Sequence, residues 1–320
     1  MTPPSDFAPA EQGSLSLIVL GGAAGGGVPQ WNCNCASCQA ARRDPSLADG
    51  QASLAFSADG ENWFLVNASP DLRQQINDIP ELHPRNGKLR DSPIAGVLLA
   101  NGEVDALVGL LSLREGSPFG IWAHDRVLSV LEQNSIFNVL DRETVPRRAI
   151  DIGTPFELVL QDGTPTGMTV EAFEVPGKSA WYLEKTSHGH QRDVPGDTLG
   201  LEITGPDGRK VFVITACAGL DQSLADRLRG AEVVFFDGTL WRDDELLVTG
   251  LGQKTGQRMG HMSMSGPDGV VEAFRDLGVK RRFFIHVNNS NPANLPDSPE
   301  RSSVEEAGWI VARQGQKVTL

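Results

Sequence analysis

The feature that most constrains this chain is a series of short apolar runs that each end in polar side chains. Residues 94–100 are continuously apolar, as expected for a strand that is buried on both faces. They lead directly into Asn101, Glu103 and Asp105, and residues 233–236 lead in the same way into Asp237. Helical patterns alternate with these runs along the chain. The sequence therefore predicts a layered α/β sandwich with polar groups at the strand ends.

The expected elements cover the chain without a linker that would divide it. A loose N-terminal leader over residues 1–13 precedes one expected domain over residues 14–320. Further strands are expected over 15–20, 54–57, 63–67, 121–123, 156–160, 168–173, 199–203, 211–215 and 282–285. Helices are expected over 36–43, 72–76, 107–113, 125–134, 222–228, 270–276 and 303–312.

The composition excludes several classes of partner. A net charge of −13 argues against nucleic acid and against anionic membrane surfaces. The N-terminus has neither the basic start nor the apolar run of a secretory signal, and no window is apolar enough for membrane insertion. Because the few cysteines are clustered, the cytoplasm is the expected compartment. A homodimer is compatible with these features.

The densest cysteine segment of the chain follows a glycine-rich loop. Residues 21–27 contain five glycines, and Cys33, Cys35 and Cys38 follow within six residues. Thiolates at this spacing are typical ligands of one soft or borderline metal. A buried cysteine cluster without metal is the alternative. A disulfide is less favoured, because three cysteines cannot pair evenly and only Cys217 remains, which we interpret as an inert strand cysteine.

A second set of metal-ligand side chains follows the expected strands. It includes Asp105, Asp237, His261 and His286. Oxygen and imidazole ligands that converge at strand ends suit Fe(II), Mn(II) or Zn(II). Each residue also has a plain structural interpretation, such as a helix N-cap for Asp105, an Asx turn for Asp237 and a buried core histidine for His286. His188 and His190 belong to an expected surface loop, for which a solvated role is favoured. Dinucleotide, P-loop and nucleophile-elbow motifs are not found.

The order of elements resembles the metallo-β-lactamase superfamily, whose fold is an αββα sandwich with metal at the strand ends. More narrowly, the motifs resemble a family that acts in the biosynthesis of the redox cofactor pyrroloquinoline quinone. The matching stretches are residues 25–38, 67–73, 109–115, 235–245, 259–263 and 285–292.

This resemblance also shows where the chain departs from its hydrolase relatives. Those enzymes carry His-X-His-X-Asp-His, which supplies most ligands of a two-zinc site. Here the same place carries Asn101, Glu103, Asp105 and Ala106, so that all three histidines are missing. The resemblance therefore implies a single Fe(II) with open positions rather than a zinc pair. Asp105 and His286 are its expected ligands, joined by Glu103, Asp237 or His261. Asp237 is alternatively a partner behind the ligands, and His261 a general acid/base.

The cysteine motif also has a counterpart in related proteins. Carbon–phosphorus lyase phosphodiesterases use the same Cys-X-Cys-X-X-Cys to hold a structural zinc. Their fourth ligand is a histidine, and the corresponding residue here is Asn289. Asn289, Asn288, an aspartate or water are the candidates for the fourth position. A closed site with three thiolates is expected to be structural.

The function implied by the resemblance is a step in making pyrroloquinoline quinone from a Glu–Tyr cross-linked peptide precursor. We expect an Fe(II)- and O2-dependent hydroxylation of the tyrosine-derived ring, with Asp105, Asp237 and His261 as the candidate catalytic groups. The alternatives are a zinc hydrolase of the parent fold and a carrier for the cofactor or its small-molecule precursor.

Overall fold

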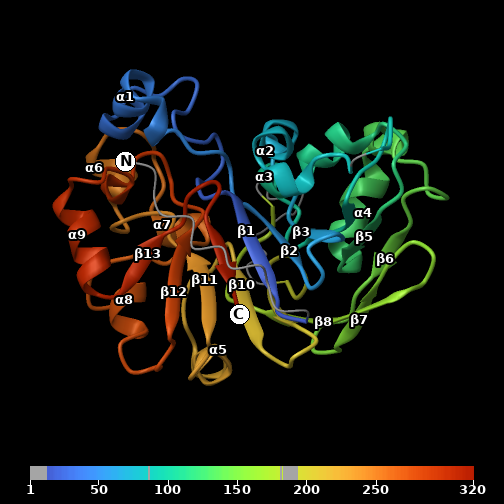
Figure 1. The fold of residues 1–320 in the computed structure, drawn as a ribbon. Coiled ribbons are helices and arrows are strands. Elements are labelled where there is room, and N and C mark those ends of the chain that lie inside the picture. Colours follow the sequence, from blue (N-terminus) through green and yellow to red (C-terminus); the bar gives the residue numbers. More distant parts are fainter. Residues whose placement is uncertain (1–12, 86, 181, 183–193) are drawn as a thin grey trace.

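The computed structural model of the chain describes residues 13–85, 87–180, 182 and 194–320. Residues 1–12 of the expected leader lie outside this part, and so do His188 and His190. The rest forms two mixed sheets that face each other (Figure 1).

Each sheet contains seven strands. In spatial order, the first is β14 (Lys317–Thr319), β1 (Ser16–Gly21), β2 (Ser53–Ser57), β3 (Trp63–Val66), β4 (Ile94–Leu99), β5 (Gly120–Ala123) and β6 (Arg147–Ala149). The second is β13 (Trp309–Val311), β12 (Arg281–Ile285), β11 (Val233–Asp237), β10 (Lys210–Ile214), β9 (Leu199–Thr204), β8 (Pro165–Glu174) and β7 (Phe156–Val159).

The helices cover the outer faces and one rim of this pair of sheets. Over the first sheet lie α2 (Leu72–Asp78), α3 (Val104–Leu107) and α4 (Asp125–Gln133), and over the second lie α5 (Gln222–Leu228), α8 (Val270–Ala273) and α9 (Pro299–Glu306). At the rim are α1 (Ala36–Arg43), α6 (Glu245–Val248) and α7 (Gly256–Met259). Short 3-10 helices span Pro45–Leu47, Pro80–Leu82, Val108–Leu113, Ser135–Val139 and Pro292–Asn294.

Three apolar layers hold the sandwich together. The central one lies between the sheets, where Leu54 and Phe64 of the first sheet belong to the same cluster as Leu201 and Phe235 of the second. The other two layers lie beneath the outer helices. Burial of apolar surface on both faces of each sheet explains why the central strands are almost continuously apolar. The expected αββα sandwich is confirmed.

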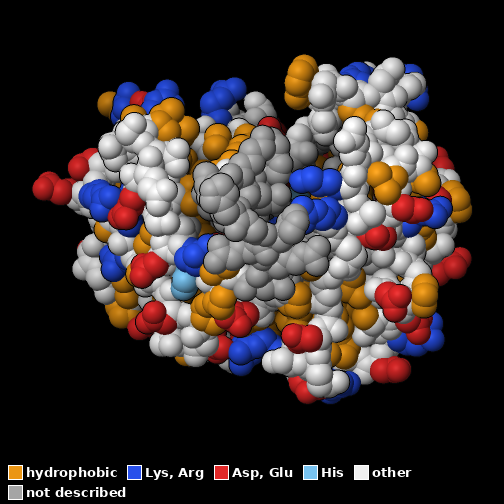
Figure 2. All heavy atoms as spheres, turned by 180° about the vertical axis from the view of Figure 1, so that it is seen from behind, with side chains coloured by type: hydrophobic (Ala, Val, Ile, Leu, Met, Phe, Trp, Pro, Cys, Tyr) orange, Lys and Arg blue, Asp and Glu red, His pale blue; other side chains and the backbone are white. Residues whose placement is uncertain are grey.

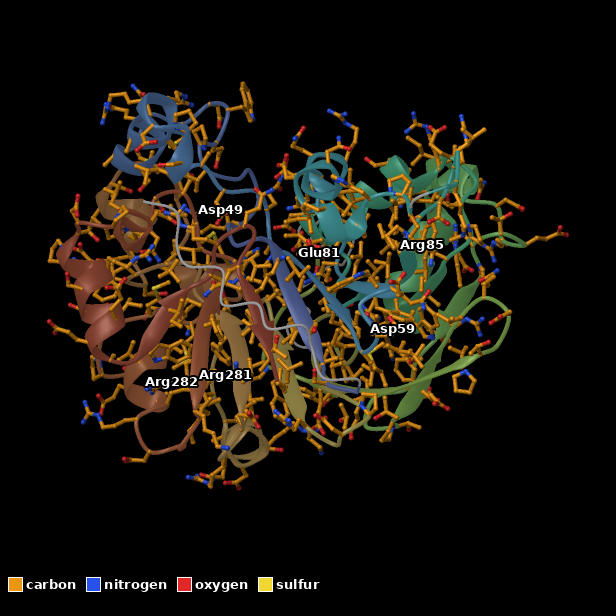
Figure 3. The ribbon with its side chains drawn as sticks, in the orientation of Figure 1. Asp49, Asp59, Glu81, Arg85, Arg281 and Arg282 are labelled. Atoms are coloured by element: carbon orange, nitrogen blue, oxygen red, sulfur yellow. The ribbon has the colours of Figure 1, made fainter. Side chains whose placement is uncertain are left out.

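Parallel strands place the polar strand ends at one edge. In the first sheet β3 to β6 are parallel, and in the second β10 to β13 are parallel. Asp237 pairs with Ile285 in the register of β11 and β12, so that Asp237 ends its strand one residue before the level of His286, which follows β12. Arg281 and Arg282 begin β12 at its opposite end (Figure 3).

Several expected elements need correction. The helix expected over 303–312 is wrong: α9 runs from Pro299 to Glu306, and 309–311 form strand β13. Gly308, with a φ of 75°, breaks the helix, and the following Trp-Ile-Val segment pairs in parallel with β12. The helix expected over 107–113 is a short α3 followed by a 3-10 turn. The residue at the N-cap of α3 is Glu103, so the interpretation of Asp105 as an N-cap is also wrong.

The surface mixes charges of both signs. Figure 2 shows acidic and basic side chains interspersed over the face opposite to the view of Figure 1. Within the described part of the chain, none of the helices has both the length and the apolar character that crossing a bilayer requires.

Candidate metal centres

Four segments that are distant in the sequence bring the predicted histidines and carboxylates together. Asp105 lies in the first turn of α3, directly after β4, and Asp237 is the last residue of β11. His286 follows β12, and His261 follows α7. The φ of His286 is 61°, a left-handed conformation that a side chain with Cβ seldom adopts. The fold therefore holds His286 in a specific orientation at the strand end.

Short contacts join these four side chains. The Nε2 atom of His286 lies 3.1 Å from Oδ2 of Asp105, and Nδ1 of His261 lies 2.6 Å from Oδ2 of Asp237. The two imidazole rings are nearly parallel, with centroids 5.2 Å apart and an angle of 23° between their planes. Both Nδ1 atoms face the buried Asp237, and the opposite edge of the His286 ring faces Asp105.

Asp237 already has a full set of hydrogen bonds. Its Oδ1 accepts from the backbone N–H and the hydroxyl of Thr239, and its Oδ2 accepts from the backbone N–H of Cys217 and pairs with His261. The side chain is completely buried. Such a carboxylate is suited to orienting the histidines from behind.

Asp105 and His286 stabilise each other's charged forms. Burial opposes ionisation of Asp105, but its hydrogen bond with His286 and the charges of His286 and His261 hold the pKa of Asp105 below its usual value. Burial likewise opposes protonation of His286, but Asp105, Asp237 and Glu103 raise the pKa of His286 above its usual value. Without metal, the pair shares a proton between Nε2 and Oδ2.

A cavity of about 550 Å³ opens in front of this cluster. Asp105, His261 and His286 line it together with Glu103, Lys178 and Lys254. The Nζ atom of Lys178 lies 3.3 Å from Oε1 of Glu103. Gly25 forms part of the wall, where a Cβ atom would lie 3.0 Å from Oδ2 of Asp105, so the glycine loop leaves room beside the carboxylate. The volume is that of a typical small-molecule site.

The three cysteines form a second, more compact cluster. The sulfur atoms of Cys33, Cys35 and Cys38 lie within 4.8 Å of one another. Backbone N–H groups of Cys35 and Gln30 donate to Sγ of Cys33 and Sγ of Cys38, at 3.4 and 3.3 Å. Burial opposes ionisation of Cys33, but hydrogen bonds from Cys35, Cys38 and Asn289 lower the pKa of its thiol. Burial raises the pKa of Cys35 to about 11, so a metal that binds all three sulfurs would displace the proton of this thiol.

Asn289 lies where the sequence predicts a fourth partner. Its side-chain nitrogen lies 3.3 Å from Sγ of Cys38, and its backbone oxygen lies 3.2 Å from Sγ of Cys35. A half-turn of the amide group would exchange its nitrogen and oxygen, so that Oδ1 would face the centre of the cysteine cluster instead. The arrangement thus supplies three soft ligands and one adaptable oxygen, which fits a closed tetrahedral zinc site.

One turn connects the two clusters. Val287 exchanges backbone hydrogen bonds with the glycine loop, since its N–H donates to Gly22 and its carbonyl accepts from Ala24. The N–H of Asn288 donates to the carbonyl of Thr239 at 2.9 Å. His286 and Asn289 therefore belong to one hydrogen-bonded segment that contacts both clusters.

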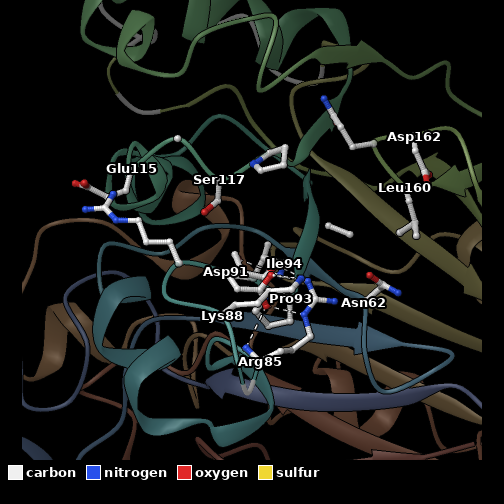
Figure 4. Close-up of a pocket in the computed structure, with 16 residues that line it drawn as sticks. Asn62, Arg85, Lys88, Asp91, Pro93, Ile94, Glu115, Ser117, Leu160 and Asp162 are labelled. Atoms are coloured by element: carbon white, nitrogen blue, oxygen red, sulfur yellow. Dashed lines mark hydrogen bonds and ion pairs between the residues drawn. The ribbon is translucent and has the colours of Figure 1, made fainter.

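A different cavity of about 500 Å³ lies at the far end of the first sheet (Figure 4). Its main polar feature is Arg85, whose Nε donates to Asp91 at 2.6 Å and, with Lys88, lowers the pKa of that carboxyl. Among the described residues that line it there is no histidine or cysteine. The chemistry of the molecule is therefore expected at the histidine cluster.

Most of the predicted residues lie in the two clusters, and one contributor was missed. Thr239 contacts Asp237, His261 and His286, although the sequence marked the residue only as part of a motif. Its position two residues after Asp237, in Asp-Gly-Thr, is the signal that an Asx turn would fold it back onto the carboxylate. Cys217 is buried beside this site, donates its thiol to Gly219 and has a pKa that burial raises to about 12.

The fold and the strand-end site define a member of the β-lactamase superfamily. The model of the family described as beta-lactamase superfamily domain matches residues 62–287. A diphosphatase of the PhnP family superposes with a TM-score of 0.67 over 96% of this chain and 97% of its own, at 20% identity, which supports the shared fold.

Relatives of higher sequence identity show which family within this superfamily the chain belongs to. Coenzyme PQQ synthesis protein B of Rhodopseudomonas palustris is 59% identical over 307 residues, covering 96% of this chain and 100% of that protein. The crystal structure of Zn(2+)-bound PqqB from Methylobacterium extorquens has a TM-score of 0.90 and 43% identity, over 95% of this chain and 100% of that one. The chain therefore belongs to the family of coenzyme PQQ synthesis protein B.

Proposed function

We propose that this protein performs an oxidative step in the biosynthesis of pyrroloquinoline quinone (PQQ). The step is the O2-dependent hydroxylation of the tyrosine-derived ring of a Glu–Tyr cross-linked precursor. The observation that carries the proposal is the meeting of Asp105, His261 and His286 at one cavity. Membership of a family of PQQ synthesis proteins supports the pathway.

The donor set fits a single Fe²⁺ ion. Two imidazoles and one carboxylate with open positions are typical of mononuclear non-haem iron oxygenases. Asp105 and His286 are the primary ligands and His261 is the third. Glu103 lines the same cavity and is a further carboxylate within the site. Asp237 accepts four hydrogen bonds behind the rings, which favours an orienting role over direct ligation.

The ion would supply O2 activation, and the protein's own groups prepare the site for it. The proton that His286 shares with Asp105 leaves when both groups become ligands, so metal binding is favoured as the pH rises. His261, held by Asp237 through Nδ1, would accept the phenolic proton of the ring at Nε2 only in place of ligation, because one lone pair cannot do both. Hydroxylation breaks one ring C–H bond, forms one C–O bond and releases the second oxygen atom as water. The reaction therefore also needs a two-electron reductant of the ascorbate or thiol class.

The cavity wall offers charges that suit this precursor. Lys178 and Lys254 line the cavity and would receive carboxylates of the Glu- and Tyr-derived parts. Both lysines are positively charged, whereas the chain as a whole has a net charge of −13. Binding at these cations would direct the aromatic ring toward Asp105 and the histidines.

The cysteine cluster has a different role in this proposal. Cys33, Cys35, Cys38 and Asn289 would hold a structural Zn²⁺, which joins the glycine loop to the turn that carries His286. The zinc-bound state of the relative from Methylobacterium extorquens is consistent with a zinc requirement in this family.

The test is O2 consumption by protein whose metals are defined. Metal-free protein is first loaded with zinc and then titrated with Fe²⁺, in the presence of a tyrosine-containing cross-linked peptide and ascorbate. We expect O2 uptake that saturates at one Fe²⁺ per chain and a product that gains one oxygen atom. The double variant Asp105→Ala/His286→Ala should be inactive. His83→Ala, at an exposed histidine, is the matched control that should remain active. Undiminished oxidation by the double variant would overturn the proposal.

A zinc hydrolase is the second candidate, favoured by the zinc-bound relative. The same titration separates it from the oxygenase. Cleavage of the peptide by zinc-loaded protein without O2 would support hydrolysis. Tight binding of the peptide without turnover under either metal would support a carrier.

A further inference from the structure

Thr239 occupies the centre of the histidine cluster. Its hydroxyl oxygen lies 2.6 Å from Oδ1 of Asp237, 2.8 Å from Nδ1 of His286 and 3.0 Å from Nδ1 of His261. The side chain is buried, with 4% of its surface exposed. Of the described side chains, those of Asp237 and Thr239 are the two polar ones that reach a ring Nδ1 atom of either histidine.

The hydrogen-bonding capacity of a hydroxyl group matches these neighbours. It has one proton to donate and two lone pairs that accept. The shortest contact is with the carboxylate, so the proton goes to Oδ1 of Asp237 rather than to the carbonyl oxygen of His286, which lies 3.1 Å away. The lone pairs then accept from the Nδ1–H groups of His286 and His261, and His261 shares its proton with Oδ2 of Asp237. Each ring then keeps the lone pair of its Nε2 for a ligand.

The backbone fixes this hydroxyl in place. The N–H of Thr239 donates to Asp237, and its carbonyl accepts from the N–H of Asn288 and from the side chain of Asn291. Asn291 is completely buried and also donates to Gly238. The oxygen of Thr239 therefore occupies the Nδ1 side of both rings, next to Asp237, whose ligand atoms lie within 4.8 Å of those of the two histidines. Nε2 of His286 instead faces Asp105, which lines the cavity.

We infer that Thr239 is a positioning residue that anchors both histidines through Nδ1 and so aims both Nε2 atoms at one cation in the cavity. This inference rests on the metal-binding role of the histidines in the proposed function. In this arrangement, one hydroxyl group aligns two ligands that come from separate segments of the chain. Loss of such a partner typically lowers metal affinity by about 10- to 100-fold.

The variants for the test differ in one hydroxyl group. Thr239→Val removes the oxygen and keeps the shape, and Thr239→Ser keeps the oxygen. Thr239→Ala is a second variant without the hydroxyl, for use if the valine does not fold. Thr215→Val is the matched control, because Thr215 is also a buried threonine of this rim and its hydroxyl contacts Asn67 rather than a histidine.

The probe is Co²⁺, added to protein whose cysteine cluster is already filled with zinc. Affinity is measured by titration of the visible absorption. The Nδ1–H protons of Co²⁺-bound histidines are followed as shifted NMR signals that exchange with solvent. We expect two such signals in the wild type and in Thr239→Ser. In Thr239→Val the signal of His286 should vanish through exchange, that of His261 should persist, and affinity should fall about 10- to 100-fold.

Each outcome decides between the claims. Unchanged affinity and two persistent signals in Thr239→Val, with normal wild-type binding, would overturn the role of Thr239 and leave the proposed function intact. The same loss of Co²⁺ affinity in Thr215→Val would also overturn it, because the loss would then reflect a general destabilisation of this edge of the sheets. Absence of Co²⁺ binding at the histidines of the wild type would overturn both the proposed function and this inference.

Discussion

The cysteine cluster and the histidine cluster bring candidate metal ligands together in opposite ways. Three candidates of the first come from six consecutive residues, and Asn289 lies beside them on the protein side. The second joins residues up to 181 positions apart and opens onto a cavity of about 550 Å³. A closed, local site suits structure, and an open site made of distant segments suits chemistry.

This difference also predicts which substitutions should lower activity and which should lower the stability of the fold. The histidine cluster rests on strand ends that the apolar layers hold in any case, so its removal should abolish activity and spare the fold. The cysteine cluster joins loops that have few apolar contacts of their own: among the described residues, Ala23, Val28 and Ala41 form the small buried cluster there, with Leu47 packed against it. Its removal should weaken the fold first and activity as a consequence.

The largest expected effect is on turnover when Asp105 is changed. Asp105→Asn keeps the shape but weakens ligation and the pairing with His286. We expect turnover to fall roughly a thousandfold, equivalent to about 4 kcal/mol in the activation barrier. The unfolding midpoint should stay within a few degrees of the wild type. Oxygen-electrode kinetics and thermal unfolding measure the two quantities. A large loss of stability would erase the contrast between the clusters.

Loss of a cysteine ligand should act in the opposite sense. Cys38→Ser should release zinc and lower the free energy of unfolding by about 3 kcal/mol or more, because metal binding contributes directly to folding. Urea unfolding with and without a zinc chelator measures this effect. Cys217→Ser is the control outside the cluster and should retain zinc. Equal zinc content in the Cys38→Ser protein would refute the assignment of the metal to this cluster.

Asp49 gives the link between the clusters a pH dependence. This residue, labelled in Figure 3, pairs with Val28 of the glycine loop, and burial raises its pKa to about 6 despite the charge of Arg313. The folded state then holds this proton more tightly than the unfolded state. The free energy of unfolding should therefore decrease as the pH rises from about 4 to about 6, by up to roughly 3 kcal/mol. Above about pH 6 it should level off. Asp49→Asn should flatten this part of the curve. An unchanged slope in that variant would show that Asp49 is not the group responsible.

The smallest expected effect concerns the cavity wall. Lys254→Gln should raise KM for the precursor about 5- to 10-fold, a change near 1 kcal/mol, with kcat nearly unchanged. Lys88→Gln, at the other cavity in Figure 4, is the matched control. A fall in kcat with constant KM would place Lys254 at the reacting atoms instead.

The sequence predicted which side chains cluster, because strand ends and cysteine spacing are local signals. Asp105, Asp237 and His286 each follow an apolar run, and parallel strands bring such ends to one edge. Asn289 came from resemblance to a family, since an asparagine carries no metal signal of its own. Its position beside Cys38 depends on contacts across 251 residues, which no local pattern reveals.

What was missed depends on tertiary contacts. Thr239 reads as an ordinary turn residue, and only the meeting of β11, β12 and the segment after α7 gives its hydroxyl three partners. The strand at 309–311 was predicted as helix because the apolar spacing continues past Gly308. Pairing with the parallel strand β12 decides its structure instead.

The central claim is a division of labour between two metals, and element-resolved metal analysis tests it most directly. Wild type, Cys38→Ser and His286→Ala are each loaded with zinc and then with Fe²⁺, freed of excess metal and measured for both elements. We predict one zinc and one iron in the wild type, loss of zinc alone in Cys38→Ser, and loss of iron alone in His286→Ala. Zinc that is lost with His286, or iron that is lost with Cys38 while His286 remains in place, would contradict the account.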